Sequence, residues 1–236
     1  MDDPRLHRHV AQGVICCDPE WEAAYRRFET PEEEINKFTR RYRAFGFEQL
    51  APDTRILEIF CGRGNGLVSL SRMGFEQIEG ADLSEELLLD FLSTHPHLSA
   101  DVHLADCMDL PFETNSYDAV VVQGGLHHLP TLPGDLRRTL SEVERVLRPD
   151  GRFFVIEPWR TPFLIAVHAI VERKLMRKIY AKGDALAEMT DHERVTYEQW
   201  LGQPDVILHA FAEHFEPIQV QKRWGKLAYI GKPRSG

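Results

Sequence analysis

Three glycines alternate with other residues in a short loop that follows an apolar run, and that run carries one acid. The segment Ile56–Gly66 reads ILEIFCGRGNG, with the acid at Glu58 and the glycines at Gly62, Gly64 and Gly66. Glycine lets a backbone turn tightly and approach a ligand closely. A loop that binds a dinucleotide pyrophosphate has the spacing G-x-G-x-x-G and needs positive potential. Here the third glycine comes one residue too early and Glu58 adds negative charge, so the loop favours a ligand with a positive charge near Glu58.

A second acid ends the next apolar segment, which reads IEGADLS with Asp82 as its acid. A carboxylate at this point of a nucleotide site accepts hydrogen bonds from the two hydroxyls of a ribose. Glu58 suits a cation, the glycines allow close approach, and Asp82 suits a ribose. S-adenosylmethionine has parts that match these features. This molecule joins an ammonium-bearing amino acid and an adenosine through a sulfonium. We therefore expect S-adenosyl-L-methionine as the cofactor.

Five segments in order resemble the successive motifs of the class I methyltransferases. They read LEIFCGRGNG, EGADLS, LADCMDLPF, YDAVVVQGGLHHLP and RVLRPDGRFFVIEP. More narrowly, they resemble the small-molecule branch that is typified by the methyltransferase type 11 domain. The resemblance is close over residues 53–158 and looser over the last two expected strands. It implies a Rossmann-like class I fold and an S-adenosylmethionine-dependent methyltransferase that acts on a small-molecule acceptor, a metabolite or a lipid-like natural product.

The resemblance also implies a role for each cofactor residue. Asp82, with Leu83 beside it, would bind the ribose. Asp106 would accept a hydrogen bond from the adenine amino group, while Cys107 and Met108 would line the adenine slot. The alternative for Asp106 is a turn cap, and the thiol of Cys107 is expected to be slot wall rather than a reactive group.

Residues around the methionine end complete this set, and one of them departs from the family pattern. Gln123 and Gly124 would face the methionine portion and the acceptor. Phe60 stands where many family members have the first glycine of the loop, so the pocket could be reshaped there. The cofactor-binding residues implied by the resemblance are Glu58, Phe60, Gly62, Gly64, Asp82, Leu83, Asp106, Cys107, Met108, Gln123 and Gly124.

Three residues are candidates for a role in transfer. His127 and His128 follow the fourth expected strand, and either could act as a base or orient the acceptor, because histidine titrates near neutral pH. Glu157 ends the fifth strand and could face the acceptor. A base is required only where the acceptor loses a proton early, as with a hydroxyl or an acidic carbon. The alternatives are loop histidines packed by their neighbours and a buried or helix-capping acid.

The acceptor is expected between helical segments at the two ends of the chain and the end of the sheet. Aromatic residues at helical spacing are also typical of a core, so this assignment competes with ordinary packing. A basic stretch at 172–182 beside apolar residues would suit a membrane surface, which is the less favoured partner. The candidate acceptor residues are Tyr25, Phe28, Tyr42, Trp159, His168, Tyr197 and Trp200.

The elements that must position these residues alternate between strand and helix patterns. Strands are expected at 55–60, 76–81, 102–104, 117–122 and 152–156, with two more over 215–230 that turn at Gly225. Strands that alternate with helices imply an α/β fold. We predict a seven-stranded, mostly parallel sheet with helices on both faces. Residues 1–50 are expected to form a helical cap, and residues 51–236 the main domain with a helical insertion at 158–214.

The composition of the chain limits which binding partners, metals and cellular locations are expected. A formal net charge of -9 argues against a nucleic-acid backbone as the partner. Four cysteines show no metal-ligand spacing, so no metal is expected. The first residues have no long apolar stretch typical of a signal peptide, which favours a cytoplasmic protein. No pattern predicts an oligomeric state.

Two other functions stay open at this point. A nicotinamide-dependent dehydrogenase would use a glycine loop, but the spacing and Glu58 disfavour it. A protein that binds S-adenosylmethionine without turnover would keep the same binding residues. Oxygen, nitrogen and carbon acceptors are all compatible with the sequence.

Overall fold

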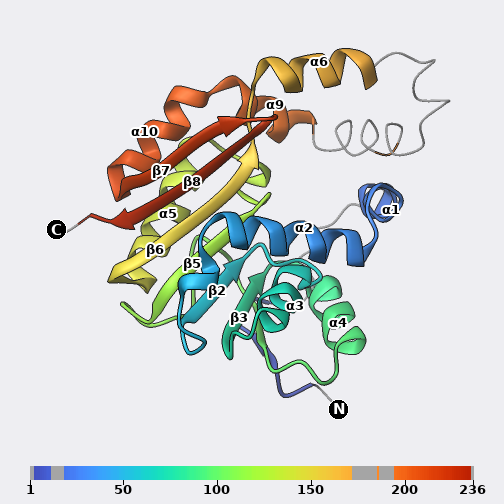
Figure 1. The fold of residues 1–236 in the computed structure, drawn as a ribbon, viewed down its shortest axis with the longest axis vertical. Coiled ribbons are helices and arrows are strands. Elements are labelled where there is room, and N and C mark those ends of the chain that lie inside the picture. Colours follow the sequence, from blue (N-terminus) through green and yellow to red (C-terminus); the bar gives the residue numbers. More distant parts are fainter. Residues whose placement is uncertain (1–2, 12–18, 172–184, 186–193, 235–236) are drawn as a thin grey trace.

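The computed structural model describes residues 3–11, 19–171, 185 and 194–234, and within them the strands form one eight-stranded sheet in the order β1-β4-β3-β2-β5-β6-β8-β7 (Figure 1). All neighbours from β1 to β6 pair in parallel, whereas β8 lies antiparallel between β6 and β7. The prediction of a mostly parallel α/β sheet is therefore confirmed. The strands are β1 (Leu6–Arg8), β2 (Arg55–Ile59), β3 (Gln77–Asp82), β4 (Asp101–Leu104), β5 (Tyr117–Gln123), β6 (Leu147–Pro158), β7 (Phe215–Arg223) and β8 (Lys226–Pro233).

Helices cover both faces of the sheet, and each face has its own apolar core. One core joins side chains of α2, α3 and α4 to the sheet, and the other joins those of α5 and α10. Such parallel strands are buried on both faces, which explains their continuous apolar runs. The helices are α1 (Pro19–Phe28), α2 (Pro31–Ala44), α3 (Asn65–Arg72), α4 (Glu85–Thr94), α5 (Gly134–Val146), α6 (Pro162–Val171), α9 (Arg194–Gly202) and α10 (Pro204–His214), with 3-10 turns η1 (Phe47–Gln49) and η2 (Leu126–His128).

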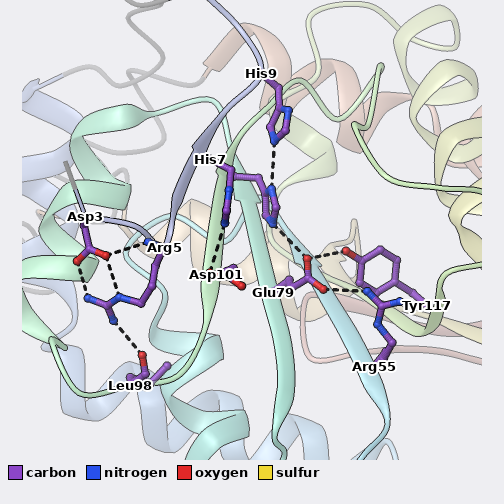
Figure 2. A network of polar contacts seen from close by, with 10 residues as sticks. Asp3, Arg5, His7, His9, Arg55, Glu79, Leu98, Asp101 and Tyr117 are labelled. Atoms are coloured by element: carbon purple, nitrogen blue, oxygen red, sulfur yellow. Dashed lines mark hydrogen bonds and ion pairs between the residues drawn. The ribbon is translucent and has the colours of Figure 1, made fainter.

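Strand β1 corrects the expectation that the first fifty residues are entirely helical and raises the expected strand count of seven to eight. It pairs in parallel with β4 at the edge of the sheet. The attachment is polar as well: the ring of His103 stacks on that of His7, and its Nε2 lies 3.1 Å from Glu79 (Figure 2). A strand of three residues is too short to show a periodic pattern in the sequence. Its strand conformation is therefore determined by these contacts with distant residues.

The insertion predicted at 158–214 is helical where the structure describes it, through α6, α9 and α10. The basic stretch at 172–182 lies outside the described residues. Within the described part of the chain, no helix has the length and apolar character needed to cross a membrane. The hairpin of β7 and β8 turns at Trp224 and Gly225, as the glycine predicted, and β8 extends the sheet next to β6.

Candidate functional site

A cavity of about 830 Å³ opens at the carboxyl ends of the central parallel strands. This volume is near the upper end of the range of about 300–1,000 Å³ that is typical of small-molecule sites. Residues at the carboxyl ends of β2, β3, β5 and β6 and from the loops after β2, β3, β4 and β5 line it, together with residues of α1, α2, α6, α9 and the start of β8. Ligands of open α/β sheets bind at this position.

Glu58 lies at the base of this cavity and is buried, with 2% of its surface exposed. Its Oε1 accepts a hydrogen bond from the Tyr42 hydroxyl at 3.2 Å and one from Nε2 of Gln123 at 3.5 Å. Its Oε2 is buried and has no hydrogen-bond partner among the residues that the structure describes. Burial raises the pKa of Glu58 to about 8, against the opposing effect of these two hydrogen bonds. A buried carboxylate oxygen without a partner is costly, and a ligand cation would satisfy it.

The glycine loop is shaped around this carboxylate. Gly62 and Gly64 have positive φ values of 52° and 66°, a region that residues with a Cβ rarely adopt. Position 66 requires a glycine for a different reason, because a Cβ there would lie 2.1 Å from Oε2 of Glu58. The third glycine therefore makes room for the acid. The residues fit the methionine end of S-adenosylmethionine, whose ammonium would meet Oε2.

Asp82 ends β3 and faces the same cavity. Its Oδ2 accepts the backbone N–H of Gly62 at 2.8 Å, and its Oδ1 accepts that of Ser84 at 2.9 Å. Burial raises the pKa of Asp82, while these backbone donors lower it. Each oxygen keeps a second lone pair, so the carboxylate can also accept from two hydroxyls. Leu83 lies beside it on the cavity wall.

The loop after β4 supplies the third predicted group. Oδ1 of Asp106 accepts the backbone N–H of Met108 at 2.8 Å, so it does cap a turn, and it also lines the cavity. Cys107 is buried, its Sγ lies 3.6 Å from the hydroxyl of Thr139, and burial raises its pKa to about 12. The thiol is thus protonated near neutral pH and serves as wall.

Phe60 adopts a left-handed backbone conformation with φ 58°, which is uncommon for a residue with a side chain. Its ring packs on Gly125, where a Cβ would lie 2.3 Å from the ring. Gly124, with φ 79°, starts the same loop after β5. The chain therefore keeps the backbone shape that a glycine at position 60 would adopt and adds an aromatic wall to the cavity.

His127 and Glu157 form a buried pair at the cavity wall. Nδ1 of His127 lies 2.7 Å from Oε2 of Glu157, and Oε1 of Glu157 accepts the backbone N–H groups of Gly125 and Leu126 at 2.8 Å each. Glu157 therefore holds the turn that carries His127, and it also orients the ring. The neighbouring His128 lines the cavity too, with its ring centroid 4.1 Å from that of His127.

Residues 57–155 match the family described as a methyltransferase domain. Over this stretch, which is less than half of the chain, the sequence is similar to a methyltransferase domain. The match contains all eleven residues predicted to bind the cofactor. S-adenosylmethionine is the methyl donor in this family.

The chain has curated relatives that agree with it over part of its length. It is 32% identical over 108 residues to the demethylmenaquinone methyltransferase of Staphylococcus haemolyticus, a match that covers 44% of this chain and 43% of that protein. It is 31% identical over 132 residues to the demethylmenaquinone methyltransferase of Corynebacterium urealyticum, covering 56% and 53%. The matched stretch therefore spans about half the length of these relatives.

Solved structures extend the likeness of the fold to nearly the whole chain. A protein from Pyrococcus horikoshii superposes with a TM-score of 0.66 at 18% identity, over 91% of this chain and 99% of that one. A geranyl diphosphate methyltransferase in complex with S-adenosylmethionine has a TM-score of 0.63 at 16% identity, over 94% and 93%. At these identities the likeness shows the fold alone.

The aromatic residues predicted for the acceptor divide into two groups in the structure. Tyr25 and Tyr197 line the cavity. Tyr42, Trp159 and Trp200 are buried in the apolar cores and do not line it, so they are removed from the acceptor set. Tyr42 instead supports Glu58, and Nε1 of Trp200 donates to the carbonyl of Pro158 at 2.8 Å. The side chain of His168 lies outside the described residues, and Phe28 does not line the cavity.

Sequence reasoning assigned no role to four basic residues of the cavity: Lys37, Arg41, Arg63 and Lys226. Lys37 and Arg41 are four residues apart on α2 and therefore share a face of that helix. This spacing was visible in the sequence, but nothing there showed which face meets the cavity. Lys226 begins β8, nearly two hundred residues later, and only the fold brings it to the same wall.

Proposed function

We propose that this protein transfers a methyl group from S-adenosylmethionine to a small-molecule acceptor bound in the same cavity. The observation that carries the proposal is Oε2 of Glu58, a buried carboxylate oxygen without a partner beside a glycine loop that leaves room for it. In a dinucleotide enzyme this place receives a pyrophosphate, which the ionised form of Glu58 would repel. An amino-acid ammonium suits it instead.

The cofactor residues take their roles from this arrangement. Glu58 binds the ammonium, Asp82 binds the ribose hydroxyls, and Asp106 accepts from the adenine amino group. Cys107 and Met108 line the adenine slot. When bound, S-adenosylmethionine supplies a methyl group made electrophilic by its sulfonium, and the chain's part is to hold the acceptor in line with it.

His127 is the proposed base for an acceptor that loses a proton. When Nδ1 donates to the Glu157 carboxylate, the neutral ring has its proton on Nδ1 and accepts through Nε2. Glu157 is a positioning residue, because it fixes both the turn and the tautomer. An oxygen or acidic carbon acceptor would use this base, whereas a neutral amine would not require it.

A partly apolar acceptor is supported by the cavity wall and by the relatives. Phe60, Leu129, Leu164 and Tyr197 are among its lining residues. The matched relatives are named for demethylmenaquinone, and one fold neighbour for geranyl diphosphate, both small organic molecules with large apolar parts. We infer an acceptor of comparable character for this chain.

Calorimetric titration with S-adenosylhomocysteine, with NAD in parallel, tests the cofactor. We expect S-adenosylhomocysteine to bind and NAD not to bind. Asp82→Ala should weaken binding about 10–100-fold, since each hydrogen bond to a charged group contributes about 1.5–3 kcal/mol. Asp109→Ala is the matched control, because Asp109 is an exposed acid of the loop after β4 that does not line the cavity.

Preference for NAD, or no binding of either by the folded protein, would contradict the proposal. Turnover is then measured as formation of S-adenosylhomocysteine from S-adenosylmethionine with demethylmenaquinol and with geranyl diphosphate. Binding without turnover on any acceptor would favour the binding-only alternative.

A further inference from the structure

One wall of the cavity is basic and has a surplus of positive charge. This basic wall consists of Lys37, Arg41 and Lys226. Lys37 is neutralised within the wall, because its Nζ contacts carboxylates of Glu29 and Glu34. The two carboxylates also act on Arg41, so the three cations of the wall leave a surplus of one positive charge, shared by Arg41 and Lys226.

Arg41 is a guanidinium facing the cavity without an acid partner. Its Nη1 donates to the neutral amide oxygen of Gln123 at 3.2 Å, and among the described residues no carboxylate lies within ion-pair distance. Burial lowers the pKa of Arg41, and the negative charges of Glu29 and Glu34 only partly oppose this effect. A desolvated cation is costly unless an anion compensates it.

Lys226 adds a second such cation at the rim. Although part of Lys226 is exposed, desolvation of its ammonium together with the positive charges of Arg41 and Lys37 lowers its pKa to about 8. In the described part of the chain, its ammonium has no ion pair or hydrogen bond. Two adjacent cations that repel each other and share one cavity form a site that an anion would stabilise.

Apolar groups surround the same wall. The ring of Phe38 lies below Arg41, with 5.5 Å between the guanidinium carbon and the ring centroid. Leu164 and Trp224 line the cavity next to Lys226, and a Cβ on the adjoining Gly225 would lie 3.2 Å from Leu164. A ligand here would meet apolar surface and positive charge together.

We propose that the methyl acceptor carries an anionic group, a carboxylate or a phosphate, which Arg41 and Lys226 bind while its apolar part lies against Phe38, Leu164 and Trp224. This inference rests on the proposed function and narrows its acceptor class to anionic amphiphiles. A neutral quinol, the acceptor that the names of the relatives suggest, would leave both cations uncompensated.

A second source of an anion is the carboxylate of the cofactor's own methionine. Arg41 is linked through Gln123 to Glu58, so an amino acid could reach both. The experiment removes this source by first saturating the protein with S-adenosylhomocysteine. Failure at that first step refutes the proposed function, whereas failure at the next step refutes this inference alone.

The saturated protein is titrated with decanoate, decyl phosphate and decanol, which share one chain and differ in the head group. We expect at least one anion to bind about tenfold or more tightly than decanol, and preference between the two anions identifies the group. Lys226→Gln should remove about tenfold of that affinity, equivalent to about 1.4 kcal/mol. Lys222→Gln is the matched control, because it removes the same charge from the same hairpin and lies outside the cavity lining.

Three results would overturn the inference: equal affinity for decanol and the anions, unchanged anion affinity in Lys226→Gln, or an equal loss in Lys222→Gln. A further titration compares the affinities of the wild type and Lys226→Gln for S-adenosylhomocysteine and for methylthioadenosine, which has no carboxylate. If Lys226→Gln weakens only the former, Lys226 serves the cofactor and the inference is overturned. Melting temperatures of both variants confirm that they are folded.

Discussion

Cofactor binding should release a proton from Glu58. This acid is buried and its pKa is about 8, so near neutral pH the carboxyl is mainly protonated when no ligand cation is present. An ammonium placed against the unpartnered Oε2 favours the ionised form and lowers the pKa. The perturbation is therefore the addition of S-adenosylhomocysteine, and the signal is a proton passed to the buffer.

The size of this signal follows from the pKa. At about pH 7 a group with a pKa of about 8 is about nine-tenths protonated, so each binding event should release about 0.9 protons. At about pH 8 the release falls to about 0.5. Affinity depends on the ionised fraction and should rise about 25-fold from about pH 6.5 to about pH 8.5.

Calorimetry in buffers of different ionisation enthalpy measures the number of protons released. The control is Glu58→Gln, which keeps the shape of the side chain and removes its titration. The ammonium of the ligand also titrates in this range, and its contribution remains in the variant. The difference between wild type and variant at each pH therefore isolates Glu58.

A release below about 0.3 protons at about pH 7 would refute the reasoning, since a pKa of about 8 predicts about three times that release. An equal release in Glu58→Gln would refute it as well, because the proton would then come from another group. Binding that is independent of pH in the wild type would show that the ammonium lies away from Glu58.

Two further predictions concern the loop and the proposed base. Gly66→Ala places a Cβ 2.1 Å from Oε2 of Glu58, so it should lower the free energy of unfolding by about 1–3 kcal/mol and remove most of the cofactor affinity. The control is Gly202→Ala, where a Cβ has nothing within 4 Å and both quantities should stay unchanged. Thermal melting measures the stability and calorimetry the affinity, and a Gly66→Ala variant with wild-type values of both would refute the shaping role of the glycine. With an oxygen or acidic carbon acceptor, His127→Asn should lower kcat about 10²–10⁴-fold at unchanged affinity for S-adenosylhomocysteine. Glu157→Gln should shift the pH profile of kcat. If His127→Asn keeps the wild-type kcat, His127 is not the base.

Much of the fold was predictable because the central strands and helices are regular. Strand β5 is a β-branched run, and α5 has apolar residues at helical spacing before a Pro-Asp-Gly stop, so both were found from local pattern. The edge strand β1 was missed because its three residues contain no period. Its hydrogen-bond partners in β4 lie nearly a hundred residues away.

The candidate site was predictable to different degrees on its two sides. All residues proposed for the cofactor lie at strand ends or in the loops that follow, where the chain order fixes their place. Most of the aromatic residues proposed for the acceptor lie in helical segments, where chain order alone does not show which residues face the cavity. Tyr42 and Tyr25 are both on helices of the first fifty residues, yet one is in the core and the other on the cavity wall, because only tertiary packing decides which helix face is buried.

This division has a consequence for the acceptor. The family match ends at residue 155 and begins at residue 57, and the proposed cofactor residues all lie inside it. Tyr25, Arg41, Tyr197 and Lys226 lie outside it and line the other side of the cavity. Similarity to the relatives over the shared part therefore supports a common methyl donor more directly than it supports a common acceptor. Under the proposed function, the acceptor would be selected by α1, α2, α9 and the start of β8, and the charge on those elements is therefore the guide to the acceptor that the proposal uses.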